Sequence, residues 1–181
     1  TLGAVPAVLS ALGIPVEWAE RCEDAFHLGH DQTSEVLAER LDSHRFAGLF
    51  RDFRNSVSQL GSYGGGNHFG ECEIVRVAES DKHREIARAF RLKDGHVAFL
   101  SHCGSRGVGH NLASHQFRTL QGKFKTWDIP FPGNDRELVY APLGTEQAND
   151  YLDDMALGAN FATVNHLLIN QLVLEAFQEI L

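Results

Sequence analysis

A short glycine-rich segment carries several side chains that can bind metal or phosphate. Glycines 64–66 are followed directly by Asn67 and His68, and Glu71 lies shortly after them. Glycine lets backbone amides approach a ligand closely, and the three side chains offer an amide, an imidazole and a carboxylate. No Lys-Ser or Lys-Thr pair follows the glycines, which excludes a P-loop. The segment indicates a phosphate site, a metal site or both, with a tight turn whose histidine bonds to the backbone as the alternative.

A second cluster follows later in the chain. His102 ends an apolar run, and Arg106 lies within the glycine-punctuated residues 103–110. The order strand, glycine turn, helix is typical of anion sites, because the first amides of a helix carry partial positive charge. Arginine adds a planar fork that matches phosphate. The cluster predicts an oxyanion site, and a capped helix with a surface arginine is the alternative.

Other reactive side chains give weaker patterns. Cys103 has neither a Gly-x-Ser-x-Gly elbow around it nor an evident carboxylate partner, which disfavours acyl transfer. His110 and His115 are five residues apart on an expected helix, a spacing that does not place two ligands on one face. The remaining histidines outside the two clusters have no ligand types at metal spacing or lie in an expected core helix.

The elements that must position the two clusters predict an α+β fold. Apolar residues recur at helical spacing from residue 6 to about residue 54, and again over residues 145–181 as one helix or two that break near Gly158. Between these regions we expect three short strands, of which the second is buried, and a helix. These lie at residues 72–78, 96–101 and 138–140, and at residues 81–90. A further helix follows the second glycine turn and precedes an irregular excursion at residues 123–136.

Composition limits the class of protein. The chain has 181 residues, 43% of them apolar, and a formal charge of −8, which fits one globular domain whose contacts with nucleic acid must be local. No apolar run approaches the roughly 18 to 20 residues of a membrane-spanning helix. The odd number of cysteines suits reduced thiols, so we expect a cytoplasmic protein without membrane contact. The chain starts without methionine and ends in an apolar stretch, so we expect it to be cut at both ends.

The two clusters belong to a longer ordered pattern. Its first runs are Gln59-Leu60-Gly61, Gly65-Gly66-Asn67-His68-Phe69 with Glu71, and His102-x-Gly104-Ser105-Arg106-Gly107-x-Gly109-His110. Its later part is Tyr140-Ala141-Pro142-Leu143, then Met155, Ala159-Asn160-Phe161-Ala162 and Asn165. In content and order the pattern resembles the RtcB family of RNA ligases. The resemblance is close over residues 57–181 and loose over the helical N-terminal third.

The resemblance implies a fold, an activity and roles for six residues. Members of the family join an RNA 3′-phosphate or 2′,3′-cyclic phosphate to a 5′-hydroxyl, in tRNA splicing and RNA repair, with GTP, a two-manganese site and a guanylylated histidine. By resemblance, His68 and His102 are ligands of the paired metal site, and Asn67 contacts the phosphates or the attacking groups. Phe69 and Glu71 bind the guanine, and Arg106 holds a phosphate of RNA or GTP. Imidazole nitrogen suits manganese, and two cations would offset the phosphate charge that an acidic chain repels.

Three parts of the family's site have no counterpart in this sequence. There is no Asp-x-x-Cys motif and no His-Gly-Ala-Gly-Arg segment to carry the guanylyl group. The downstream His-Asn ligand pair is also missing, because His110-Asn111 stands in the wrong context to be that pair. We therefore expect residues 1–181 to be one partial domain, with a helical scaffold at 1–56 and the metal and GTP region at 57–181. We expect this partial domain to be inactive without the remainder of the ligase. A noncatalytic RNA-binding or scaffold module, and a phosphoesterase with one metal on His68, His102 and Glu71, are the alternatives.

Overall fold

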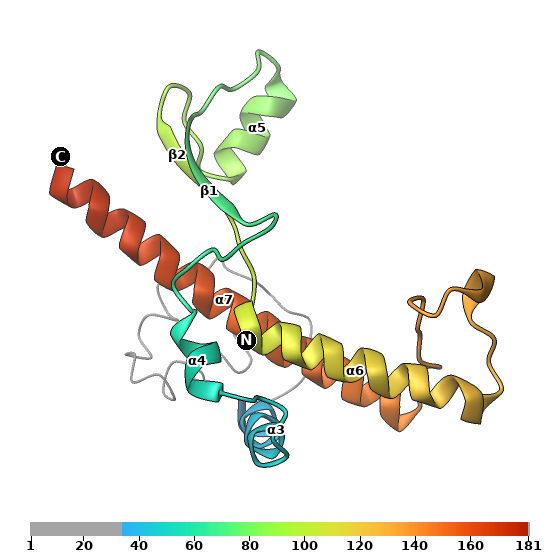
Figure 1. The fold of residues 1–181 in the computed structure, drawn as a ribbon. Coiled ribbons are helices and arrows are strands. Elements are labelled where there is room, and N and C mark those ends of the chain that lie inside the picture. The colour runs from blue at the N-terminus through green and yellow to red at the C-terminus, as the bar shows by residue number, and fades with distance from the viewer. Residues whose placement is uncertain (1–33, 181) are drawn as a thin grey trace. The chain divides into compact units, whose positions relative to one another are not determined.

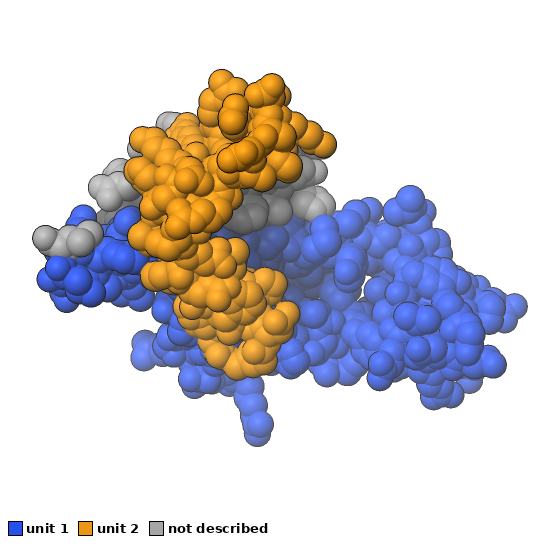
Figure 2. Space-filling model, turned by 90° about the horizontal axis from the view of Figure 1, so that it is seen from above, with its two compact units in different colours: residues 1–62, 104–181 blue, residues 63–103 orange. Residues whose placement is uncertain are grey.

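The computed structural model describes residues 34–180, and the side chains of residues 39–180. Within this range the chain forms two compact units, shown in different colours in Figure 2. Unit 1 comprises residues 1–62 and 104–181, and unit 2 comprises residues 63–103. Helices together with a two-stranded antiparallel sheet confirm the α+β class. The helices expected before residue 34 lie outside the described residues, and the single domain over 1–181 stays a prediction.

Two long helices dominate unit 1, α6 (Arg106–Trp127) and α7 (Glu146–Ile180), which run antiparallel along each other (Figure 1). On α6 the buried residues recur every four positions, so one face of the helix is buried, and α6 packs with α7. They are Val108, Leu112, Gln116, Leu120 and Phe124. Of the two alternatives for the C-terminal region, one helix or two that break near Gly158, the structure has the single helix. A β-carbon at Gly158 would lie 3.8 Å from the α-carbon of Gly109, so glycine meets glycine where the two helices cross.

In the described part of unit 1 there are two further, shorter helices, α3 (Ser34–Phe46) and α4 (Phe53–Ser58). Asp52 caps α4, since its side chain accepts a hydrogen bond from the Asn55 amide at 3.0 Å. The core is formed by apolar side chains of α3, α6, α7 and the residues between α3 and α4. Its buried members are Leu41, Phe50, Val108, Leu112, Ala156, Leu157, Phe161, Val164 and Leu167.

The connection between α6 and α7 differs from the expectation. Helix α6 continues to Trp127, into the expected irregular excursion, and its capping residue Asp128 takes the left-handed conformation with φ of 55°. A short 3-10 turn, η1 (Pro132–Asn134), follows. Residues 138–140 form no strand, so that prediction was wrong. Tyr140 packs instead edge-on against Phe124 of α6, with ring centroids 5.0 Å apart, and so gains contact without pairing its backbone.

Unit 2 consists of β1 (Phe69–Ile74), α5 (Asp81–Ala89) and β2 (Val97–His102). The strands pair antiparallel in a register that runs from Phe69 opposite His102 to Ile74 opposite Val97. The helix and the second strand lie where they were predicted, whereas β1 begins at Phe69 instead of residue 72. The prediction that the second strand is buried was wrong, because Val97 is 58% exposed.

None of the helices within residues 34–180 is both long and apolar enough to cross a membrane.

Candidate functional site

His68 and His102, far apart in the sequence, meet in unit 2. His102 is the last residue of β2 and lies opposite Phe69, the first residue of β1. His68 directly precedes β1, so the strand register brings the two imidazoles to the same end of the sheet. Their ring centroids are 6.1 Å apart, and both side chains are exposed. The structure therefore brings together the two residues for which the sequence predicted a shared metal role.

The surroundings of His68 prepare it as a metal ligand. Its Nδ1 lies 2.9 Å from the carbonyl oxygen of Gly65. A carbonyl can only accept, so Nδ1 carries the proton and the lone pair is on Nε2, as in most histidines that bind metal. With metal–nitrogen bonds of roughly 2.1 Å, two rings on one cation have centroids no more than about 6.5 Å apart. The observed spacing lies within this reach, so the distance between the two rings allows one shared cation.

The three-ligand alternative was wrong for this structure. Among residues 34–180, no three His, Cys, Asp or Glu side chains are grouped closely enough to hold a metal ion. Glu71 therefore does not complete a site with His68 and His102.

Phe69 and Glu71 share one face of the sheet with His102. Successive strand residues point to opposite faces, so Phe69 and Glu71 lie on the same side of β1 and His102 lies directly across from Phe69. The rings of Phe69 and His102 are stacked, with centroids 5.4 Å apart and planes 5° from parallel. Phe69 is 41% exposed and Glu71 is exposed. An aromatic face and a carboxylate thus lie on the same face of the sheet as His102. The guanine role of Phe69 and Glu71 stays a prediction.

Gly70 lies between these two residues on the opposite face of β1, where the ring of Tyr63 covers it. A β-carbon at Gly70 would overlap the Tyr63 ring and lie 2.7 Å from Cζ of Phe99. The Tyr63 hydroxyl is 3.1 Å from Oγ of Ser101, a hydrogen bond that joins the approach to β1 to β2. Glycine at this position therefore allows the Tyr63 ring to pack on this face of the sheet.

The Gly70→Ala variant is expected to destabilise unit 2 by about 1–3 kcal/mol, because the added methyl group must displace an aromatic ring. Gly65→Ala is the matched control, since a β-carbon there would have no neighbour within 4 Å. Thermal unfolding followed by NMR signals of β1 and β2 measures both variants. Equal melting of the two variants would contradict the tight packing at Gly70.

Arg106 lies in unit 1, as the first residue of α6. It has a left-handed backbone, with φ of 54°, a conformation that is costly for a residue with a side chain. Its Nε donates to the carbonyl of Gln59 at 3.4 Å, and the next amide, of Gly107, donates to Oε1 of Gln59 at 3.2 Å. Gln59 thus holds the start of α6, where Ser105 makes no side-chain cap. The phosphate role of Arg106 stays a prediction, as does that of Asn67, which is exposed in the turn before β1.

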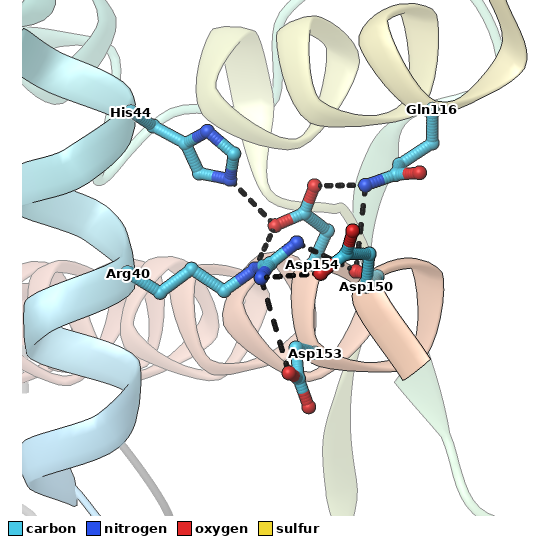
Figure 3. Close-up of polar contacts among 6 residues, drawn as sticks. All are labelled: Arg40, His44, Gln116, Asp150, Asp153 and Asp154. Atoms are coloured by element: carbon cyan, nitrogen blue, oxygen red, sulfur yellow. Dashed lines mark hydrogen bonds and ion pairs between the residues drawn. The ribbon is translucent and has the colours of Figure 1, made fainter. Parts of the chain in front are cut away.

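A buried polar network in unit 1 was missed in the sequence (Figure 3). At its centre is the carboxylate of Asp154 on α7, whose side chain is 2% exposed. It accepts hydrogen bonds from Arg40, from His44 at 2.7 Å and from Nε2 of Gln116 at 2.6 Å. Arg40 also bonds to Asp150, at 3.2 Å from the carboxylate and 2.8 Å from the carbonyl oxygen. The network joins α3, α6 and α7.

The charges in this network support each other. Burial alone would raise the pKa of Asp154, but hydrogen bonds from His44, Arg40 and Gln116 outweigh it and hold the pKa below its usual value. Burial alone would lower the pKa of Arg40, yet the bonds to Asp154 and Asp150 raise it. The available signal in the sequence was three aspartates, 150, 153 and 154, the last two spaced three and four residues after the first within one helix. Their partner helix could not be identified from spacing.

Comparison with known proteins identifies the family of this chain. A family model described as tRNA-splicing ligase RtcB matches residues 13–181, so the chain belongs to the RtcB family. The tRNA-splicing ligase RtcB of Pyrococcus furiosus is 43% identical over 127 residues, which cover 70% of this chain and 13% of that protein. The proteins of the same name from Nanoarchaeum equitans and Thermococcus kodakarensis are 43% identical over 124 residues and 40% identical over 127 residues. The match to the Nanoarchaeum protein covers 68% of this chain and 24% of that protein. The match to the Thermococcus protein covers 70% of this chain and 25% of that protein. The matched part of the chain thus spans a quarter or less of each of these relatives.

Proposed function

We propose that this chain is part of an RNA ligase that joins RNA 3′-phosphate or 2′,3′-cyclic phosphate ends to 5′-hydroxyl ends, with GTP and manganese. Membership of the RtcB family and relatives named tRNA-splicing ligase support the reaction class. The observation that carries the site is the approach of the His68 and His102 rings to 6.1 Å at one end of a two-stranded sheet. Action on tRNA in the cytoplasm, as expected from the sequence, belongs to the same proposal.

The chain's own residues would divide the work as follows. His68, fixed by its bond to Gly65, and His102, stacked on Phe69, present imidazole nitrogens to divalent cations. Bound manganese would neutralise phosphate charge and polarise the phosphoryl group. Phe69 offers an aromatic face for the guanine and Glu71 a carboxylate for its N–H groups. Asn67 and Arg106 supply polar contacts to phosphate oxygens.

A manganese titration of the 181-residue chain tests the metal role. We expect the wild-type chain to bind Mn²⁺, and His68→Ala and His102→Ala each to weaken binding by at least about tenfold, since each removes a ligand. His96→Ala is the matched control, because His96 is an exposed histidine directly before β2 and should bind like wild type. Calorimetry or Mn²⁺ electron spin resonance measures the affinities. No binding at millimolar Mn²⁺, or equal binding by all variants, would contradict the proposal.

The proposal also requires the rest of the ligase for catalysis. The histidine that accepts the guanylyl group in the family has no counterpart among these residues. Incubation of the chain with GTP and Mn²⁺ should therefore leave its intact mass unchanged. A covalent guanylyl adduct in mass spectrometry would show that the chain contains its own nucleophile and would contradict this part of the proposal.

A further inference from the structure

Asn165 on α7 uses its whole side-chain amide to hold two distant parts of the backbone. The residue is completely buried, at 0% exposure. Its Oδ1 accepts from the amides of Gly61 at 2.7 Å and Ser62 at 3.3 Å. Its Nδ2 donates to the carbonyls of Ser62 at 3.2 Å and Gly104 at 2.8 Å. Two acceptor and two donor positions are all that an asparagine side chain offers, so none is left over.

The residues that Asn165 holds are the points at which the chain leaves and re-enters unit 1. Ser62 is the last residue before unit 2, and Gly104 is the first residue after it. A single side chain therefore ties both crossings together and fixes the distance between them. This arrangement needs no contact between Asn165 and unit 2 itself.

The two crossings lead to the two histidines by very different paths. From Gly104 back to His102, the chain enters the sheet almost at once, because β2 ends at His102. From Ser62 to His68, the chain runs through the glycine turn before the strand ladder begins at Phe69. The starting point of this glycine-rich segment is held by Asn165, and the next anchor is the bond from Tyr63 to Ser101.

We propose that Asn165 is a positioning residue that sets the spacing of His68 and His102 by holding both crossings. When its bonds are lost, the glycine-rich segment gains freedom at its start, and the His68 ring moves relative to His102. The stacking of Phe69 on His102 depends on the strand ladder and persists. That the pair binds a cation rests on the proposed function, whereas the positioning itself can be measured without metal.

Two variants of Asn165 and one control separate positioning from general destabilisation. Asn165→Leu removes all four hydrogen bonds, and Asn165→Asp keeps the acceptors for Gly61 and Ser62 while losing both donors. Asn160→Leu is the control, because Asn160 lies on the same helix and is equally buried, at 1% exposure. Among the described residues its amide bonds only within α7, to the Ala156 carbonyl at 2.8 Å. All three variants lose buried polar contacts, but only those at Asn165 affect the crossings.

The first readout is the nuclear Overhauser effect between ring protons in the metal-free chain. In Asn165→Leu we expect the His68–His102 signal to disappear while the Phe69–His102 signal remains, and in Asn160→Leu we expect both to remain. If Asn165→Leu fails to fold, Asn165→Asp, which releases Gly104 and so no longer ties the two crossings together, should weaken the His68–His102 signal while the Phe69–His102 signal remains. A His68–His102 signal that persists in the folded Asn165 variants would overturn the proposal, as would its equal loss in Asn160→Leu.

The second readout is Mn²⁺ affinity, which should fall about tenfold in the Asn165 variants and stay at the wild-type value in Asn160→Leu, as for an outer residue that orients a ligand. Unchanged affinity despite the lost ring signal would overturn the link to the metal site. If the wild-type chain binds no Mn²⁺, the proposed function fails, and the ring-proton experiment still decides the positioning role by itself.

Discussion

Replacing Asp154 with alanine is expected to destabilise unit 1 by about 3 kcal/mol, because it leaves Arg40, His44 and Gln116 without their shared acceptor. Asp154 is almost completely buried, so water cannot take over its role. Urea unfolding at neutral pH measures the change in the free energy of unfolding. Asp42→Ala is the matched control, since Asp42 pairs with Arg45 on the surface of α3, where both side chains are about half exposed. This exposed pair should contribute less than about 1 kcal/mol, and an equal loss in the two variants would contradict the central role of Asp154.

The Asp154 carboxylate also makes the free energy of unfolding of unit 1 depend on pH. Because folding lowers the pKa of Asp154, the stabilisation is complete above the unfolded pKa of about 3.9 and is lost as the pH falls through the lower folded value. The free-energy difference between the wild type and Asp154→Asn should therefore be constant at neutral pH and shrink on acidification below about pH 4. A difference that grew on acidification would show that the carboxylate is not held in its charged form.

Replacing Phe161 with alanine is expected to cost about 3–5 kcal/mol, the range for emptying a large aromatic site in a packed core. Phe161 is 1% exposed and lies on α7 in the main cluster of apolar side chains of unit 1. Phe46→Ala is the control in the same unit, because Phe46 is 90% exposed and should lose little on truncation. Urea unfolding measures both variants. A similar loss for both would mean that α7 is not held by its apolar face.

Both variants bear on function through α7. This helix carries Asp154 and Phe161, which hold it against α3 and α6, and Asn165, which holds the crossings to unit 2. We therefore expect Asp154→Ala and Phe161→Ala to weaken Mn²⁺ binding only under conditions that unfold α7. Asn165 variants should weaken it in the folded chain. The three positions thus separate support of the helix from positioning of the histidine pair.

Local patterns in the sequence were sufficient to predict an element wherever a few neighbouring residues determine its structure. The apolar period of four predicted α7, and the serine cap before Asp81 is consistent with the predicted helix α5. The resemblance of the glycine and histidine motifs to the RtcB family predicted the pairing of His68 with His102, and the strand register brings the two rings together. The strand at residues 138–140 was wrong because a strand needs a partner, and the apolar run there is satisfied by packing Tyr140 on Phe124.

The sequence by itself determined the family, the helices with strong periodicity, and the residue types available for metal and nucleotide. Only the tertiary structure decided that Asp154 is the shared acceptor for side chains of α3 and α6, and that Asn165 joins Gly61 and Ser62 to Gly104. Arg40 and Asp154 are separated by 114 positions, and Asn165 and Gly61 by 104. Hydrogen bonds between residues so far apart in the sequence produce no periodic pattern in it. Which side chains pair is determined by how whole helices pack together, and neighbouring residues in the chain do not determine it.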